Sequence, residues 1–230
     1  KACSELFAAK GYLLLLAGRD RLKLESFQLD LNLRYAIKSG IIEINPPDQS
    51  TLDHVFQSIS GNLDVILCAI GTLGNHHEAM NSPQDGLEII DSNYRSIIPL
   101  LQSAANRLKN QNRGKLIVIT SVAGLRGRAS NYFYGSAKAG LIAYLSGLRN
   151  ALHPYRVQVT TVIPGYVKTR MTKNMHLPPL LTCSTESLAK AIYRYTVKGK
   201  RNILYWKPIW RYIMLIIRIM PESVFKRMRW

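Results

Sequence analysis

The chain has 230 residues, 47% of them hydrophobic, and no low-complexity tract, which predicts one globular domain without requiring a second. Its formal net charge of +17 predicts attraction to an anionic partner, whether nucleic acid, a phosphorylated cofactor or an acidic membrane surface. The three cysteines are scattered and lack metal-ligand spacing, which argues against a disulfide framework and a metal site and favours reduced thiols in a cytoplasmic protein.

The N-terminal part of the chain alternates short apolar runs with amphipathic stretches. Tyr12–Ala17 is an apolar run that ends at Gly18, and Arg21–Tyr35 has helical spacing with Asp20 as its candidate N-cap. The elements expected next are a strand at Gly40–Ile44, a helix at Ser50–Ile59, a strand at Leu63–Ile70 and a long helix at Gln84–Asn110.

The C-terminal part continues this alternation. The expected elements are a strand at Lys115–Thr120, a helix at Tyr132–Leu152, a strand at Val157–Ile163, a helix at Ser184–Lys198 and a strand at Asn202–Tyr205. Strands that are apolar throughout and alternate with helices indicate a parallel sheet covered on both faces. The sequence therefore predicts a doubly wound, Rossmann-like α/β domain at residues 1–205, with ligands bound at the carboxyl ends of the strands, and a basic, aromatic helical extension at residues 206–230.

The start of the chain lacks one part of this fold. A doubly wound sheet begins with a strand and a glycine-rich turn, which binds the pyrophosphate of a dinucleotide at a helix N-terminus. The residues from Lys1 to Phe7 instead indicate that this helix is already under way. Either an earlier segment precedes this sequence, or the protein binds a dinucleotide in another way. We expect the first, because a sheet without its central strand would leave unpaired backbone on both neighbours.

The segment Tyr134-Gly-Ser-Ala-Lys138 carries the clearest chemistry. The tyrosine and the lysine are four residues apart, so they lie on the same face of the expected helix. Reduction of a carbonyl by hydride needs a proton donor, and a neighbouring ammonium favours the phenolate and so lowers the pKa of a tyrosine. The spacing alone is more often a plain helix surface, so its interpretation depends on the residues around it.

Three further features lie at strand ends or on a helix face. Ser121 ends a strand thirteen residues before the tyrosine, and its hydroxyl bonds either a substrate oxygen or its own turn. Asn93 lies inside the expected long helix, where asparagine is unfavourable. Another strand ends in the rigid turn Pro164-Gly165, followed by the hydroxyl of Thr169. Their convergence on one crevice indicates an enzyme.

With these motifs, the chain resembles the short-chain dehydrogenase/reductase family from Ala2 to about Lys200. The resemblance implies an NAD(P)H-dependent oxidoreductase that reduces a keto group and oxidises the alcohol in reverse. It also implies a homodimer or homotetramer built through long helices. Four catalytic residues follow from it: Asn93, Ser121, Tyr134 and Lys138.

The resemblance implies a role for each of the four. Tyr134 would be the general acid, and Lys138 would lower its pKa and bind the nicotinamide ribose. Ser121 would orient the carbonyl. Asn93 would hold a water that links the lysine to solvent.

Cofactor contacts are implied in the loops after the strands. Arg19 follows a strand end at which NAD-dependent members carry an acidic residue, whose carboxylate accepts hydrogen bonds from the ribose hydroxyls. An arginine at this place can instead pair with a 2′-phosphate. NADP is therefore preferred over NAD. Asn45 stands where an aspartate often meets the adenine amine, and only Gly71 remains of the usual Asn-Asn-Ala-Gly motif. The expected cofactor-binding residues are Arg19, Asn45, Ala69, Gly71, Tyr134, Lys138, Pro164, Gly165, Val167 and Thr169.

The tail from Arg194 to Trp230 is strongly basic, with ten Lys and Arg residues and a single acidic one. Its apolar stretch between Pro208 and Pro221 is too short to span a bilayer, and no signal peptide or longer apolar run is present. The stretch is either a buried or dimer-contact helix, or an interfacial helix with its Trp, Tyr and Arg side chains at headgroup level. We expect a cytoplasmic protein, and in the second case a peripheral one on the inner face of the cell membrane.

The tail and the loop before Tyr134 resemble decaprenyl-phospho-2-keto-sugar reductase-like members of the family, which implies an amphipathic or lipid-linked, sugar-like substrate. Arg126 and Arg128 in that loop either bind a substrate phosphate or are loop side chains without a binding role. The alternative enzyme is a soluble ketone or 3-oxoacyl reductase whose tail is a core or dimer element. A nucleic-acid binder lacks any recognised motif. A catalytically idle cofactor sensor is disfavoured by the complete set of four residues.

Overall fold

The computed structural model describes residues 1–44, 49–173 and 175–228. The helices are α1 Ala2–Ala8, α2 Arg21–Tyr35, α3 Gln49–Ser58, α4 His76–Asn81, α5 Pro83–Ile90, α6 Ile97–Gln111, α7 Tyr132–Leu152, α8 Thr185–Ile192, α9 Ile209–Ile219 and α10 Glu222–Phe225. The strands are β1 Leu15–Gly18, β2 Gly40–Glu43, β3 Val65–Cys68, β4 Gly114–Ile119, β5 Val157–Pro164, β6 Tyr166–Val167, β7 Thr182–Cys183 and β8 Ile203–Trp206. The order of elements confirms the predicted Rossmann-like α/β fold.

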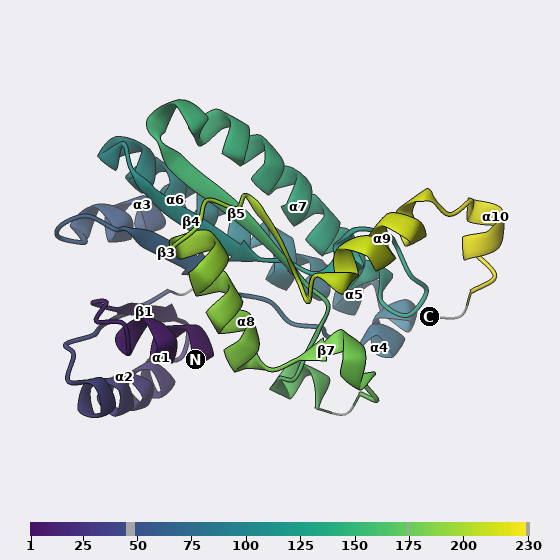
Figure 1. The fold of residues 1–230 in the computed structure, drawn as a ribbon, viewed down its shortest axis with the longest axis horizontal. Coiled ribbons are helices and arrows are strands. Elements are labelled where there is room, and N and C mark those ends of the chain that lie inside the picture. The colour runs from purple at the N-terminus through teal and green to yellow at the C-terminus, as the bar shows by residue number, and fades with distance from the viewer. Residues whose placement is uncertain (45–48, 174, 229–230) are drawn as a thin grey trace.

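The central sheet is parallel and has the strand order β3-β4-β5-β8. Helices α3, α6 and α7 lie on one side of it and α8 lies on the other (Figure 1). Successive side chains of a strand point to opposite faces. Leu116 and Val118 of β4 therefore pack in the cluster under α6 and α7, whereas Ile117 packs with Ile192 of α8. Because both faces are covered, the central strands are largely apolar, although β5 also contains the polar residues Gln158, Thr160 and Thr161.

The strands at the N-terminal end form a separate parallel pair, β1-β2. Within the described residues, β1 pairs only with β2, and β3 pairs only with β4. The interruption between β1 and β3 lies where the sequence analysis expects an additional strand. That strand stays a prediction.

The long helix predicted at Gln84–Asn110 is interrupted, which corrects the sequence analysis. A π-helical turn at Asp91–Arg95 separates α5 from α6. The Asn93 amide donates to the carbonyl of Ile89, so a side chain occupies a place in the helical hydrogen-bond ladder. Pro99 lacks the N–H that would bond the carbonyl of Arg95 in a regular helix. Such π-helical turns are common at functional sites.

Other boundaries also differ from those predicted. The helix predicted at Ser184–Lys198 is α-helical only to Ile192 and continues as a π-helical turn at Tyr193–Val197. Helix α4 and the short ladder between β6 and β7 were not expected. Asp20 is confirmed as the N-cap of α2, because its carboxylate accepts from the backbone N–H of Lys23 at 3.0 Å.

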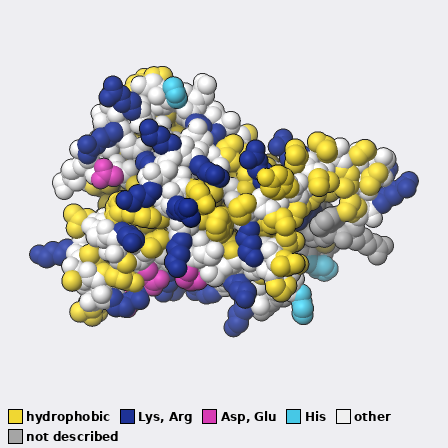
Figure 2. Space-filling model, viewed as in Figure 1, with side chains coloured by type: hydrophobic (Ala, Val, Ile, Leu, Met, Phe, Trp, Pro, Cys, Tyr) yellow, Lys and Arg dark blue, Asp and Glu magenta, His cyan; other side chains and the backbone are white. Residues whose placement is uncertain are grey.

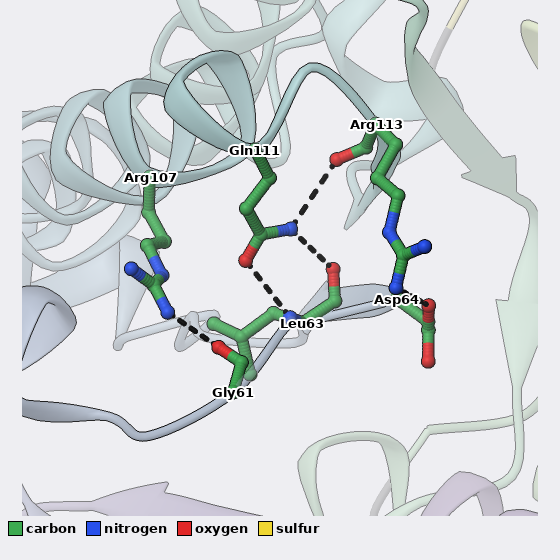
Figure 3. Close-up of polar contacts among 6 residues, drawn as sticks. All are labelled: Gly61, Leu63, Asp64, Arg107, Gln111 and Arg113. Atoms are coloured by element: carbon green, nitrogen blue, oxygen red, sulfur yellow. Dashed lines mark hydrogen bonds and ion pairs between the residues drawn. The ribbon is translucent and has the colours of Figure 1, made fainter.

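Hydrogen bonds and an ion pair connect the end of α6 to the segment that leads into β3 (Figure 3). The Gln111 amide accepts from the Leu63 N–H at 2.9 Å and donates to the Leu63 carbonyl at 3.0 Å. Arg113 forms an ion pair with Asp64, and Arg107 donates to the Gly61 carbonyl. These contacts fix the start of β3, and so help to place the loop that follows its other end.

The C-terminal extension packs onto the end of the sheet that carries Ser121. Trp210, Met214 and Ile217 lie on one side of α9 and are buried against Val122 and Ile163. None of the helices in the described part of the chain combines the length and apolar character needed to cross a membrane.

Candidate active site

The buried end of Lys138 meets the loop that follows β3. The lysine side chain is only 3% exposed, and its Nζ donates to the carbonyl of Ile70 at 3.4 Å. A Cβ at Gly71 would lie 2.6 Å from Oδ1 of Asn93 and 2.9 Å from Nζ of Lys138. The backbone of Gly71 therefore passes between these two side chains, and a larger residue there would push at least one of them away.

Asn93 is fully buried in the π-helical turn and holds the same loop. Its Nδ2 donates to the carbonyl of Thr72 at 2.6 Å, and its Oδ1 accepts from the N–H of Thr72 at 3.2 Å. The amide thus bonds the backbone of Thr72 in both directions, as a neighbouring strand would. The asparagine that is unfavourable for a helix fixes the loop beside Lys138.

Tyr134 lies one turn before Lys138 on α7 and connects it to Ser121. The lysine Nζ is 5.6 Å from the centre of the Tyr134 ring, and the phenol lies near enough to the Ser121 hydroxyl for this hydroxyl to influence its pKa. Ser121 Oγ also accepts from the N–H of Ala123 at 3.1 Å. Of the two predicted alternatives for Ser121, the bond to its own turn is present, and the bond to a substrate oxygen stays a prediction.

The turn after Ser121 is pressed tightly against α7. A Cβ at Gly124 would lie 2.7 Å from the backbone carbon of Lys138, and a Cβ at Gly135 would lie 3.0 Å from the carbonyl oxygen of Ala123. The two glycines let the turn and the helix approach closely. This approach brings the hydroxyl of Ser121 to the phenol of Tyr134.

Burial dominates the electrostatics of the pair. Burial lowers the pKa of Lys138 to about 8, while the nearby thiol of Cys68 acts in the opposite direction. Burial also raises the pKa of the partly exposed Tyr134, and the hydrogen bond with Ser121 opposes that rise. The net shift of the tyrosine is upward, opposite to the direction expected from its spacing to the lysine. The Lys138 ammonium points to the Ile70 carbonyl, which explains its weak influence on the phenol.

The Pro164-Gly165 turn lies against the C-terminal extension, a contact the sequence analysis missed. A Cβ at Gly165 would fall 1.8 Å from Nε1 of Trp210, so the indole rests directly on the glycine. The same Nε1 donates to the carbonyl of Leu181 at 3.0 Å. Trp210 is 3% exposed, so for this side chain the structure favours the buried-helix alternative over a place at the lipid headgroups. No local pattern signals this contact, because it joins residues 45 positions apart.

The remaining predicted cofactor residues lie at strand ends, with one exception. Arg19 is exposed directly after β1, and Ala69 is exposed directly after β3. Val167 lies in β6, and Thr169 begins a short turn in which its N–H donates to Oγ1 of Thr172 at 3.0 Å. Asn45 lies outside the described residues.

Arg126 and Arg128 hold the C-terminal extension, a role that the sequence analysis did not consider. Arg126 donates to the carbonyl of Arg218 at 3.2 Å and forms an ion pair with Glu222 at 2.5 Å. Arg128 is 9% exposed and donates to the sulfur of Met214 at 3.6 Å. The loop that starts at Ser121 is therefore bound to α9 and to the residues after it.

A hollow of about 350 Å³ lies between this loop and α10. Its lining combines apolar and aromatic side chains with two cations and one carboxylate, that of Glu222. The lining residues are Gly127, Arg128, Ala129, Tyr132, Glu222, Phe225, Lys226 and Met228. Within residues 1–44, 49–173 and 175–228, no group of three or more His, Cys, Asp or Glu side chains is placed to hold a metal ion.

Comparison with known proteins points to one family. A model of the family described as short chain dehydrogenase matches residues 1–178. The chain is 34% identical to an uncharacterized oxidoreductase of Mycobacterium tuberculosis, over 96% of this chain and 89% of that protein. It is 25% identical to a 3-oxoacyl-[acyl-carrier-protein] reductase of Aquifex aeolicus, over 75% of this chain and 71% of that protein.

Solved structures share the fold. A short-chain dehydrogenase from Sphingobium yanoikuyae in complex with NADPH superposes with a TM-score of 0.79, at 17% identity and over 99% of this chain and 91% of that chain. At this identity the likeness concerns the arrangement of helices and strands.

Proposed function

The chain belongs to the short chain dehydrogenase family, and from this premise we propose that it is an NAD(P)H-dependent oxidoreductase that reduces a keto group and oxidises the alcohol in reverse. One observation carries the proposal: Tyr134 and the buried Lys138 lie one turn apart at the start of α7, and Ser121 begins the turn that packs against this helix. Fully buried Asn93 fixes the loop against which the lysine packs. This is a proton donor with a polarising hydroxyl on one side and a cation on the other.

Each side chain has a role in the proposed reduction. A bound NADPH supplies the hydride that the carbonyl carbon receives. Tyr134 gives its phenolic proton to the carbonyl oxygen, and the Ser121 hydroxyl donates a hydrogen bond to the same oxygen. Lys138 would stabilise the tyrosinate that this transfer leaves behind, and its ammonium would hold the nicotinamide ribose of a bound cofactor. Asn93 keeps the lysine in place through the backbone of Thr72.

The residues present fit a dinucleotide, with NADP preferred over NAD. The exposed backbone from Ala69 to Gly71 has no side chain at Gly71, where a Cβ would collide with Lys138 and Asn93. Arg19 is exposed after β1, where it can pair with a 2′-phosphate. Asp20 is engaged as the N-cap of α2, so its carboxylate is turned to the helix. The NADPH in the Sphingobium yanoikuyae structure supports the same choice.

The remaining predicted contacts belong to this proposal. Pro164, Gly165, Val167 and Thr169 would border the nicotinamide, and Asn45 would meet the adenine amine. We propose a homodimer or homotetramer, as the family resemblance implies.

We propose an amphipathic or lipid-linked, sugar-like keto substrate, met by the loop after Ser121 together with α10, while residues 206–230 would provide a membrane surface. The supporting observation is the hollow beside that loop, which presents Phe225 and Met228 together with Arg128 and Lys226. Apolar walls suit a lipid chain, and the cations suit a phosphate. The enzyme would then work in the cytoplasm as a peripheral protein on the inner face of the cell membrane.

A second candidate is a soluble ketone or 3-oxoacyl reductase, in which α9 serves as a core or dimer element. The Aquifex aeolicus relative is named as a 3-oxoacyl reductase, and the buried side of α9 supports a role in the core.

A screen of NADPH oxidation tests the proposal and separates the candidates. Keto sugars, lipid-linked keto sugars and 3-oxoacyl thioesters are offered in turn to the wild-type protein and to Tyr134→Phe. We expect turnover in the wild type alone, greatest with a lipid-linked keto sugar. Preference for a 3-oxoacyl thioester would favour the second candidate, and no reduction of any keto compound would overturn both.

A further inference from the structure

We propose that the outward side of α9, with the basic residues beside it, is a docking surface for a membrane rich in anionic lipid. This inference deepens the proposed function, because it names the surface on which a lipid-linked substrate would be met. The biological purpose of the surface rests on the proposed function, whereas its binding to lipid can be tested separately. The surface comprises Ile209, Arg211, Tyr212, Leu215, Ile216, Arg218, Ile219, Val224, Lys226 and Arg227.

The outward side of α9 is apolar and exposed. Leu215 and Ile216 are 59% and 60% exposed, and Tyr212 and Ile219 are 64% and 73% exposed. Soluble proteins rarely leave a contiguous group of large apolar side chains in water. Figure 2 shows hydrophobic side chains gathered where α9 and α10 lie in Figure 1.

The direction of this apolar side is fixed by the opposite side of the helix. Trp210, Met214 and Ile217 are each less than 5% exposed and are packed into the core. Because an α-helix has 3.6 residues per turn, positions 212, 215, 216 and 219 then point away from the core. Helix α9 packs against its own domain through one side only. The apolar side chains of the other side are therefore removed from water only when something outside the domain covers them.

The charges beside the apolar side favour an anionic lipid as that phase. Arg211 and Arg218 are seven residues apart, lie on the same flank of α9 and are exposed. Lys226 and Arg227 are exposed just beyond α10. The nearest acid, Glu222, is paired with Arg126. Figure 2 shows the same excess of Lys and Arg over Asp and Glu on this face of the molecule.

A second copy of the chain fits this surface less well. Pairing two outward sides would bring the flanking arginines of two chains of net charge +17 together, which costs electrostatic energy. An anionic bilayer accepts the apolar side chains into its interfacial region and the cations at its headgroups. With 11 residues, α9 suits a helix that lies in the plane of the interface.

Docking in this orientation would bring the proposed site to the lipid. The loop after Ser121 is bound to α9 and α10 through Arg126, and the Pro164-Gly165 turn is bound to α9 through Trp210. The hollow that contains Arg128 lies between that loop and α10. A lipid-linked headgroup could thus enter while its chain stays in the bilayer.

Vesicle flotation tests the surface. The full chain is mixed with phosphatidylcholine vesicles and, separately, with phosphatidylcholine vesicles that contain phosphatidylglycerol. We expect binding to the second only, and its loss at high salt because screening weakens attraction to anionic headgroups. Equal binding to both vesicles, or to neither, overturns the proposal.

Two variants with matched controls assign the binding to residues. Leu215→Gln/Ile216→Gln/Ile219→Gln should abolish flotation, whereas Leu29→Gln/Leu33→Gln on α2, which are 62% and 75% exposed, should not change it. Arg211→Gln/Arg218→Gln should weaken binding about tenfold or more. Lys10→Gln/Lys38→Gln removes the same charge from exposed positions near α1 and α2 and should have a smaller effect.

Two readouts keep the outcomes distinct. Reduction of a water-soluble ketone without vesicles reports the proposed chemistry, and the Leu215→Gln/Ile216→Gln/Ile219→Gln variant should retain it. If wild-type protein reduces the ketone but ignores anionic vesicles, docking is refuted and the chemistry stands. If sedimentation then shows that this variant breaks an oligomer into single chains, the surface is a subunit interface. Vesicle binding without any keto reduction would refute the chemistry alone.

Discussion

The indole of Trp210 lies directly on Gly165, so closely that a Cβ on the glycine would fall 1.8 Å from Nε1. Gly165 belongs to the turn that ends β5, and its N–H also donates to the carbonyl of Trp206 at 3.0 Å. The C-terminal extension thus forms one wall of the turn proposed to border the nicotinamide. A disturbance of α9 would reach the cofactor site through this contact.

We predict that Gly165→Ala weakens NADPH binding, because the added methyl group must displace the indole or the turn. The expected result is a rise of about tenfold in KM for NADPH, together with a loss of roughly 1–3 kcal/mol in the free energy of unfolding from overpacking. Steady-state kinetics and denaturant unfolding measure the two effects. Gly147→Ala is the control, since a Cβ there meets no atom within 4 Å. Equal behaviour of the two variants would refute the coupling.

Gly71→Ala should impair catalysis more than folding. The new methyl group would collide with Oδ1 of Asn93 and Nζ of Lys138, so the lysine, or the asparagine that fixes the loop beside it, must leave its position. We expect kcat to fall about a hundredfold, as when a positioned catalytic group is displaced. Gly127→Ala is the control, because its Cβ lies in open space. A kcat within twofold of wild type for Gly71→Ala would contradict this role of the glycine.

Lys138→Met should stabilise the fold while it removes activity. Burial lowers the pKa of Lys138 from 10.5 to about 8, which corresponds to about 3 kcal/mol of unfavourable free energy for the charged form. This cost is fully present below about pH 8. It is relieved as the pH rises toward 10.5, because the unfolded chain then binds more protons than the folded one.

Denaturant unfolding of Lys138→Met and wild type at several pH values measures this effect. The variant should gain up to about 3 kcal/mol at pH 7, and the gain should vanish near pH 10.5. A variant less stable than wild type at pH 7 would show that the ammonium contributes favourably to the fold.

The pH dependence of reduction should follow Lys138. Tyr134 stays protonated at neutral pH because burial raises its pKa, whereas Lys138 loses its charge above about pH 8. We expect kcat/KM for reduction to fall above about pH 8, because the tyrosinate left by proton transfer is then no longer stabilised by the Lys138 ammonium. Lys138→Arg, which keeps its charge, should remove the decline above pH 8. A reduction profile that is flat to pH 10 would contradict the assignment.

The regular parts of the fold followed from local patterns. Both faces of the central sheet are covered, so its strands are mostly apolar. For this reason a short apolar run such as Lys115–Thr120 could be predicted to be a buried strand. The pair Tyr134 and Lys138 could be placed together because helical geometry alone sets the positions of residues four apart. The N-cap at Asp20 likewise depends only on its own first turn.

Features that depend on distant contacts could not be predicted. The π-helical turn at Asn93 forms where its amide bonds the backbone of Thr72, 21 residues away. Arg126 and Arg128 were considered for a substrate phosphate or as loop decoration, yet their partners lie about 90 residues further along the chain. The pKa of Tyr134 rises because burial outweighs the hydrogen bond with Ser121, and burial is a property of the folded chain.

Proton transfer from Tyr134 is the central step of the proposed reaction. The most direct measurement is kcat for NADPH-dependent reduction of the best keto substrate by Tyr134→Phe, beside Tyr144→Phe. Tyr144 is the matched control: it lies on the same helix, and its phenol donates to Gln102 at 3.1 Å, away from Lys138. We predict a loss of about a hundredfold to ten-thousandfold for Tyr134→Phe, the usual worth of a general acid, and near wild-type turnover for Tyr144→Phe. Undiminished turnover in Tyr134→Phe would contradict the mechanism.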